Sequence, residues 1–265
     1  MVVTNALGWT FDTVASTYEK MRPGYPEELY RTLFRYCPLG PESRAVEVGT
    51  GGGQATEPVL GTGCDLIAVE PGEKFSSLLR EKFKAYDNFS VLTGKFEEVD
   101  LPENSFDLVF SATAFHWVPE RIGYEKVFSL LKPGGTFARF ANHPDRDKGN
   151  PALSDEIDRL YAEYYYPFHN RTPEKLREYG EQQAAELAGL AGKYGFTDIC
   201  HALFYRTRSF TAPEYTALLG TYSDHIALEE SVRTAFFREI ERAIHRHGGT
   251  LTVYDTIDLQ LARKP

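Results

Sequence analysis

The chain has 265 residues, of which 42% are hydrophobic and 25% charged, and its formal net charge is −9. These values are ordinary for a folded soluble protein, and the length allows one large domain or one domain with an insertion. The acidic balance argues against nucleic-acid binding, which needs a basic surface. No secretory signal and no membrane-spanning apolar run are visible, so we expect a cytoplasmic location and no membrane partner.

The N-terminal segment, residues 9–36, predicts two helices joined by a proline turn. The first covers about residues 11–20 and ends before Pro23. The second begins at Pro26, because proline is well tolerated in the first turn of a helix. We expect this segment to form a helical cap.

A glycine-rich turn follows a short buried strand, Ala45–Val48, and leads into a helix over about residues 54–60. The pattern E-x-G-x-G-x-G runs from Glu47 to Gly53. Glycines let the backbone turn tightly and let a ligand approach, and the following helix start offers free N–H groups. A dinucleotide fingerprint would need glycine at position 54, and no Walker tripeptide follows. The acid at the strand end suits a cationic or amino-bearing ligand better than a phosphate.

The second strand, residues 64–70, ends in Glu70, about 20 residues beyond the glycine turn. A carboxylate at this place in an α/β fold accepts hydrogen bonds from both ribose hydroxyls. Glu70 therefore favours an adenosine-bearing ligand without selecting which one.

Three further strands are predicted at residues 89–92, near 106–110 and at 136–141, with helices over 73–86 and about 120–131. Ligands in open α/β sheets sit beyond the carboxyl ends of the strands, where the strand order reverses. The first and fourth strands flank that point. Residues 111–117 should therefore lie at the reacting end of the ligand.

These motifs, in this order, resemble the class I S-adenosylmethionine (SAM) methyltransferases, in particular the ubiquinone/menaquinone-biosynthesis-like group. The resemblance rests on the glycine turn, Glu70, the segment after the fourth strand, the turn Leu131–Gly135 and the N-terminal Tyr18/Arg22-Pro element. It implies a Rossmann-like, doubly wound α/β fold with a seven-stranded sheet. That sheet would be mostly parallel with an antiparallel last strand, with helical lid insertions.

The resemblance also implies the cofactor SAM, with S-adenosylhomocysteine as product, and it assigns the residues that hold it. The glycine turn would lie against the methionine half, and the turn after the third strand would cover the adenine, where Lys95 replaces a frequent Asp. The predicted cofactor-binding residues are Tyr18, Arg22, Glu47, Gly49, Thr50, Gly51, Glu70, Pro71, Phe96, Glu97, Ser111 and Ala112.

Methyl transfer from a sulfonium is an in-line displacement, so alignment of the acceptor matters most, and a protonated acceptor also needs a base. His116 is the candidate base. In the alternative interpretation, it hydrogen-bonds the backbone and orients Trp117. We expect a small-molecule acceptor in a pocket formed by His116, Trp117, Tyr165 and His169. Arginines at positions 22, 139, 171, 206 and 208 are candidates to bind an acceptor carboxylate. No metal site is predicted.

The second half of the chain departs from strand–helix alternation. Helices are predicted over about 152–166 and 174–192, then a strand over 199–210, helices near 213–222 and 228–247, and a last strand over 250–263. We expect one methyltransferase domain, 1–265. Its core would comprise about 37–141 and 196–265, with the cap at 9–36 and a helical lid at about 142–195.

Two other functions fit parts of the pattern: an NAD-linked oxidoreductase, which Gln54 disfavours, and a non-catalytic SAM-binding protein. The three cysteines are widely spaced and imply no disulfide framework. The acceptor's identity and the oligomeric state cannot be predicted from the sequence.

Overall fold

The computed structural model describes residues 21–172 and 178–265. The chain divides into two compact units, each of which is described by itself. The sheet unit comprises Pro23–Asn142, Tyr179–Phe204 and Ile257–Pro265. The helical unit contains the described residues of Met1–Arg22, His143–Glu178 and Tyr205–Thr256.

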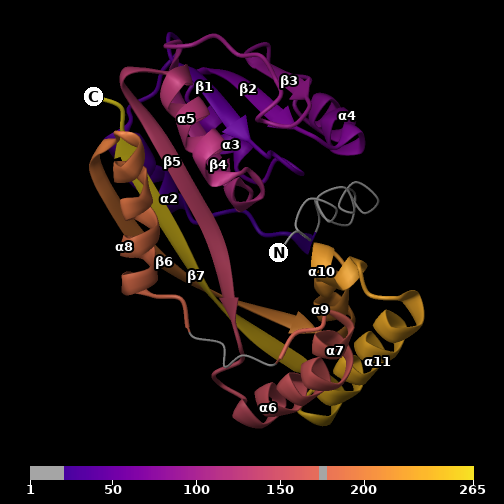
Figure 1. Cartoon of the computed structure of the whole chain (residues 1–265). Coiled ribbons are helices and arrows are strands. Elements are labelled where there is room, and N and C mark those ends of the chain that lie inside the picture. Colours follow the sequence, from indigo (N-terminus) through magenta and orange to yellow (C-terminus); the bar gives the residue numbers. More distant parts are fainter. Residues whose placement is uncertain (1–20, 173–177) are drawn as a thin grey trace. The chain divides into compact units, whose positions relative to one another are not determined.

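The sheet has seven strands in the order β3-β2-β1-β4-β5-β7-β6 (Figure 1). The pairs β1–β2, β1–β4, β2–β3 and β4–β5 are parallel. β7 is antiparallel to β5. Gly134 N–H donates to Lys264 O (2.8 Å), and Lys264 N–H donates to Gly135 O (2.9 Å). This confirms the predicted fold class. The strands are β1 (Arg44–Val48), β2 (Asp65–Glu70), β3 (Phe89–Thr93), β4 (Phe106–Ala112), β5 (Leu131–Asp145), β6 (Thr197–Thr211) and β7 (Thr250–Arg263).

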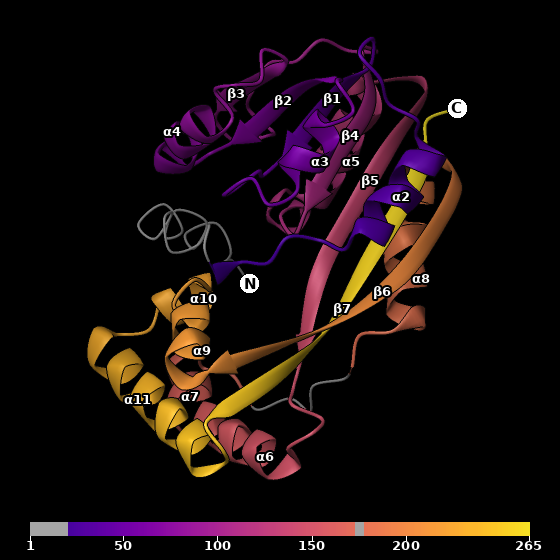
Figure 2. The same cartoon turned by 180° about the vertical axis from the view of Figure 1, so that it is seen from behind.

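Side chains alternate between the two faces of the sheet, so each face has its own hydrophobic core. Ala45 and Leu66 belong to one core, which α2, α3 and α4 complete; Figure 2 shows α2 in front of the sheet. Val46 and Val109 belong to the other, with α5 and residues 190–196. The helices are α2 (Glu27–Tyr36), α3 (Thr56–Leu60), α4 (Glu73–Lys82), α5 (Glu120–Leu130) and α8 (Glu181–Gly189), with 3₁₀ turns at Phe115–Trp117 and Leu190–Tyr194.

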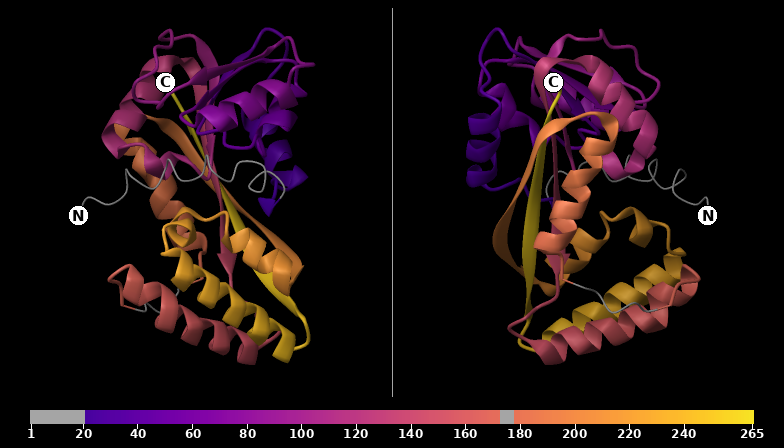
Figure 3. Two further views of the ribbon diagram at one scale, coloured as in Figure 1. Left: turned by 90° about the vertical axis from the view of Figure 1, so that its right-hand side faces the viewer. Right: turned by 60° about the vertical axis from the view of Figure 1, so that its left-hand side comes forward.

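The helical unit packs its helices around a third core that includes Ile157, Phe236, Ile240 and Val253. α6 and α11 lie side by side (Figure 3). Its elements are α6 (Pro151–Leu160), a π-helical turn (Tyr161–Tyr165), α7 (Tyr166–Phe168), α9 (Ala212–Leu219), α10 (Ser223–Ile226) and α11 (Glu230–Arg246), with the ends of β5, β6 and β7.

The two compact units have other bounds than the predicted cap and lid, which stay predictions. The division into units groups residues 179–204 with the sheet and residues 205–256 with the helices, and the predicted lid covers about 142–195. α2 supplies Leu29 and Leu33 to the first core, so it is part of the sheet unit rather than a separate cap. Amphipathic periodicity shows that a helix is half-buried, but it does not show which core it buries into.

Element boundaries differ more modestly. The predicted helix 152–166 is broken by the π-helical turn, and β5 begins at Leu131, before the Pro-Gly-Gly turn. β3 and β4 are joined by residues 94–105, which contain no helix. The three cysteines are free, and Cys37 and Cys64 are buried. Among the described residues, no helix is long and apolar enough to cross a membrane.

Candidate active site

The glycine turn after β1 has the left-handed conformations that its sequence predicts. Gly49, Gly51 and Gly53 have φ values of 71°, 57° and 74°. A Cβ on Gly49 would lie 2.4 Å from the Ala114 Cβ, so the segment after β4 packs directly on this turn. Both follow the carboxyl ends of β1 and β4, the neighbouring strands between which the sheet order reverses.

Two buried carboxyl groups flank the turn. Glu47 is 1% exposed and accepts a hydrogen bond from Thr56 Oγ1 at 2.7 Å. Burial raises its pKa to about 8, because desolvation favours the neutral form. Glu70, at the end of β2, accepts from Gly51 N–H at 2.7 Å and from Gly72 N–H at 2.9 Å.

Two polar side-chain atoms at the turn are buried and have no hydrogen-bond partner among the described residues: Thr50 Oγ1 and Gln54 Nε2. Buried polar atoms are normally paired, and an exception needs an explanation. SAM carries a carboxylate, an ammonium and two ribose hydroxyls, which are groups that these atoms and the two acids are able to bind. The residues present therefore fit the cofactor that the resemblance implies.

The residues predicted to lie near the adenine and ribose have less support from the structure. Phe96 is 3% exposed and lies in the second core of the sheet unit, beneath the Lys126 ammonium at 5.2 Å. The Phe96 ring is therefore occupied in the core, and a contact with the adenine through its main-chain N–H stays a prediction. Glu97 and Pro71 are half-buried on neighbouring turns.

The carboxyl end of β4 is hydrogen-bonded to β1, and the segment after β4 contains the predicted acceptor-side residues. Ser111 Oγ donates to Val48 O at 2.8 Å. Thr113 has a φ of 54°, rare for a β-branched residue, and its Oγ1 lies 2.7 Å from the Tyr25 hydroxyl. His116 is exposed on the 3₁₀ turn, and the centroid of its ring lies 4.9 Å from the ring centroid of Trp117. Ala112 precedes them, half-buried.

Three predicted residues belong to the helical unit, and Tyr18 lies outside the described residues. The Arg22 guanidinium donates to Thr221 Oγ1 and O, each at 3.1 Å, and lies over the Tyr222 ring at 4.0 Å. Tyr165 and His169 contact Asp224, as described below. Of the four residues predicted for the acceptor pocket, His116 and Trp117 lie in the sheet unit, and Tyr165 and His169 lie in the helical unit.

Comparisons with known proteins agree with this geometry. Residues 46–138 match the methyltransferase domain family. An uncharacterized methyltransferase of Schizosaccharomyces pombe is 26% identical over 259 residues, which are 96% of this chain and 94% of that protein. The sterol 24-C-methyltransferase of Saccharomyces cerevisiae is 34% identical over 83% of this chain, but the match covers only 64% of that longer protein.

A solved structure shows the same fold with a bound product. Phosphoethanolamine N-methyltransferase 2 of Haemonchus contortus, in complex with phosphomonomethylethanolamine and S-adenosylhomocysteine, has a TM-score of 0.56 and 17% identity; the match covers all of this chain and 61% of that one. The chain is a class I SAM-dependent methyltransferase. Its cofactor is SAM, and an NAD-linked activity is not favoured.

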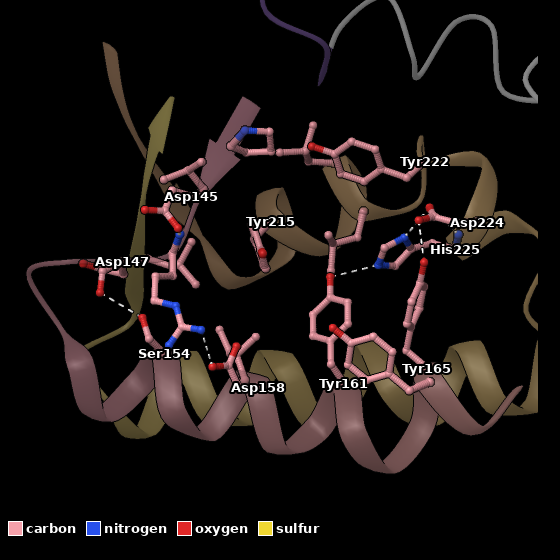
Figure 4. Close-up of a pocket in the computed structure, with 18 of the residues that line it drawn as sticks. Asp145, Asp147, Ser154, Asp158, Tyr161, Tyr165, Tyr215, Tyr222, Asp224 and His225 are labelled. Atoms are coloured by element: carbon pink, nitrogen blue, oxygen red, sulfur yellow. Dashed lines mark hydrogen bonds and ion pairs between the residues drawn. The ribbon is translucent and has the colours of Figure 1, made fainter. Parts of the chain in front are cut away.

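The methyltransferase also contains a polar cluster that the sequence did not predict. Asp224 and His225 lie in α10, and they contact Tyr165 and Tyr161 of the π-helical turn (Figure 4). All four line a cavity of about 890 Å³ within the helical unit. Tyr165 was predicted for the pocket from its aromatic neighbourhood, but His225 has no motif around it. Only the fold brings residues some 60 positions apart into contact.

Proposed function

We propose that this enzyme methylates a small molecule, with SAM held at the glycine turn of the sheet unit. Glu47, Thr50, Gly51 and Glu70 are the residues with the strongest support, and the remaining predicted cofactor contacts follow from the resemblance. The observation that carries the proposal is a pair of buried atoms, Thr50 Oγ1 and Gln54 Nε2, that lack a hydrogen-bond partner within 21–172 and 178–265. They lie beside two acids on a turn of left-handed glycines. The acidic chain further disfavours polyanionic acceptors.

Calorimetric titration of the full chain with S-adenosylhomocysteine tests the site. Gly51→Leu should abolish binding, because a side chain at a φ of 57° is strained and would occupy the ligand's path. Gly134→Leu is the matched control: its φ is 81°, and no atom lies within 4 Å of the added Cβ. Equal binding by both variants would refute the assignment.

His116 remains the proposed base of the sheet unit. His116→Ala should then lower kcat with little effect on product affinity, by about 100-fold if the residue accepts a proton in the transition state. An unchanged kcat would leave His116 as a surface residue that supports Trp117.

A further inference from the structure

Three segments of the sheet unit meet at the glycine turn. Ala114, after β4, packs against Gly49, because a Cβ on that glycine would lie 2.4 Å from the Ala114 Cβ. Gly24 belongs to the proline turn at residues 23–26, and a Cβ placed on it would lie 3.7 Å from the Gln54 carbonyl oxygen. The proline turn before α2 and the segment after β4 therefore both border the proposed SAM site.

Thr113 has an unusual backbone conformation for its residue type. In the part of the chain that the structure describes, the other non-glycine residues with a positive φ are Asn104, Asn170 and Asp198. Asn and Asp tolerate the left-handed region, whereas a β-branched side chain is strained there. The φ of 54° at Thr113 needs surrounding contacts to hold it, and strain of this kind is concentrated at functional sites.

Hydrogen bonds with three neighbouring residues hold Thr113 in this conformation. Its N–H donates to Phe140 O at 2.8 Å, and its Oγ1 accepts from the Asn142 N–H at 3.3 Å. The third bond joins Oγ1 to the Tyr25 hydroxyl at 2.7 Å, and either oxygen is able to donate. The Tyr25 ring is fixed in turn, edge-on to the buried Phe140 ring with centroids 4.8 Å apart. Tyr25 therefore clamps the strained residue from the proline turn.

The residues that follow Thr113 include the predicted acceptor-side groups. Trp117 N–H donates to Ala114 O at 3.0 Å, which closes the 3₁₀ turn, and Phe115 is 5% exposed in the second core of the sheet unit. Because Thr113 is clamped and Phe115 is buried, the two residues that come next have their backbone held in one orientation. A change at Thr113 would therefore alter the placement of His116 and Trp117.

We propose that Tyr25 is a positioning residue for methyl transfer. Through Thr113, it fixes the segment that presents His116 and Trp117 at the reacting end of SAM. This rests on the methyl-transfer function proposed above, because it takes SAM to occupy the glycine turn. The role involves no contact between Tyr25 and the transferred methyl group. Loss of the Tyr25 hydroxyl should disturb the reacting end of the bound cofactor and spare the affinity for its remaining groups.

The affinities of the full chain for S-adenosylhomocysteine and for sinefungin test this role by calorimetry. Sinefungin is a stable analogue of SAM in which CH–NH₃⁺ replaces S⁺–CH₃, so its amino group reports on the reacting end. Tyr25→Phe should weaken sinefungin binding about fivefold, as for the loss of one hydrogen bond, and S-adenosylhomocysteine binding by less than about twofold. Tyr36→Phe is the matched control, because its hydroxyl donates to Asp198 O at 2.8 Å in the same unit.

Variants of Thr113 test whether Tyr25 acts through this residue. Thr113→Val stays β-branched and lacks Oγ1, so it should reproduce the selective loss of sinefungin affinity. Thr113→Ser keeps Oγ1 and should bind both ligands as the unsubstituted chain does.

Trp117 provides a second readout. The chain has two tryptophans, Trp9 and Trp117, so Trp9→Phe leaves Trp117 as the single emitter. In that background, S-adenosylhomocysteine should change the Trp117 emission saturably, and Tyr25→Phe should raise the acrylamide quenching constant of Trp117, whereas Tyr36→Phe should not.

Equal behaviour of Tyr25→Phe and Tyr36→Phe in both readouts would overturn the inference. An equal fall in the affinities for the two ligands in Tyr25→Phe would also overturn it, because that result indicates a general loss of the site. Failure of the unsubstituted chain to bind S-adenosylhomocysteine would instead refute the proposed function, and this inference with it.

Discussion

The two units of this enzyme place their functional groups in different ways. In the sheet unit, the glycine turn and Glu47 lie within seven consecutive residues, and Glu70 follows one strand later. In the helical unit, Tyr161 meets His225 across 64 positions of the chain. A site built on one turn leaves a readable sequence pattern. A site built by packing helices does not, so the two units differ in how far their chemistry can be predicted.

The largest expected effect concerns the stability of the helical unit. Asp255, whose side chain is fully buried, binds both Arg206 (3.2 Å) and Arg208 (2.5 Å). Asp255→Ala would leave two guanidinium groups half-buried without their anion, which typically costs about 3–5 kcal/mol. Urea unfolding measures this cost. Glu27→Ala is the contrasting control in the sheet unit, because its pair with Arg31 is exposed and contributes about 0.5 kcal/mol or less. Similar losses for both variants would contradict the expectation.

The second effect tests whether Glu70 is a ligand-binding residue. Its carboxylate accepts two main-chain N–H groups, and Glu70→Gln replaces one acceptor oxygen with a donor. Hydrogen bonds to charged groups are worth about 1.5–3 kcal/mol, so S-adenosylhomocysteine should bind about 10- to 100-fold more weakly. Glu73→Gln, exposed in the first turn of α4, is the control measured by the same calorimetry. Loss of affinity in both variants would point to a general charge effect.

The sequence predicted the parts of the fold that local rules determine. All seven strands were located, because short apolar runs bounded by glycine and proline have few alternatives. The sequence did not show that residues 205–256 belong with the helical unit, because helix periodicity carries no information on partners. The π-helical turn at 161–165 was likewise missed. For the site, the acids and glycines were found, whereas Asp224 and His225 were not, since their pairing depends on how α10 meets that turn.

The third effect concerns pH and is specific to the sheet unit. Burial raises the pKa of Glu47 from 4.5 to about 8, so the folded protein binds a proton that the unfolded chain releases. Stability should therefore fall as pH rises from about 4.5 to 8, by at most about 1.4 kcal/mol per pH unit. Glu47→Gln stays neutral and should lose this dependence. Urea unfolding at several pH values checks it, and parallel curves for the two proteins would show that Glu47 ionises freely.

Glu47 should also couple the binding of the cofactor to the release of a proton. The ammonium of a bound SAM or S-adenosylhomocysteine favours the ionised carboxylate, so binding at neutral pH should release close to one proton from a group with a pKa of about 8. Calorimetry in buffers with different ionisation enthalpies measures this number. Glu47→Gln should release none, and equal release by both proteins would place the linked proton elsewhere.

The smallest expected effect concerns the start of α6. It tests whether the helix is stabilised there by its own cap or by a contact with another element. Asn150 caps α6: its Oδ1 accepts from Leu153 N–H at 3.2 Å, while its Nδ2 donates to His247 O at 3.2 Å. Asn150→Ala removes both bonds and should cost about 1 kcal/mol, which corresponds to a fall in Tm of about 2–4 °C. Asn150→Asp keeps the capping acceptor and loses only the bond to His247, so it should cost less. If the two variants were equally destabilised, α6 would depend on its tertiary contact rather than on its cap. The start of α6 would then depend on tertiary packing, as the Tyr161–His225 contact does.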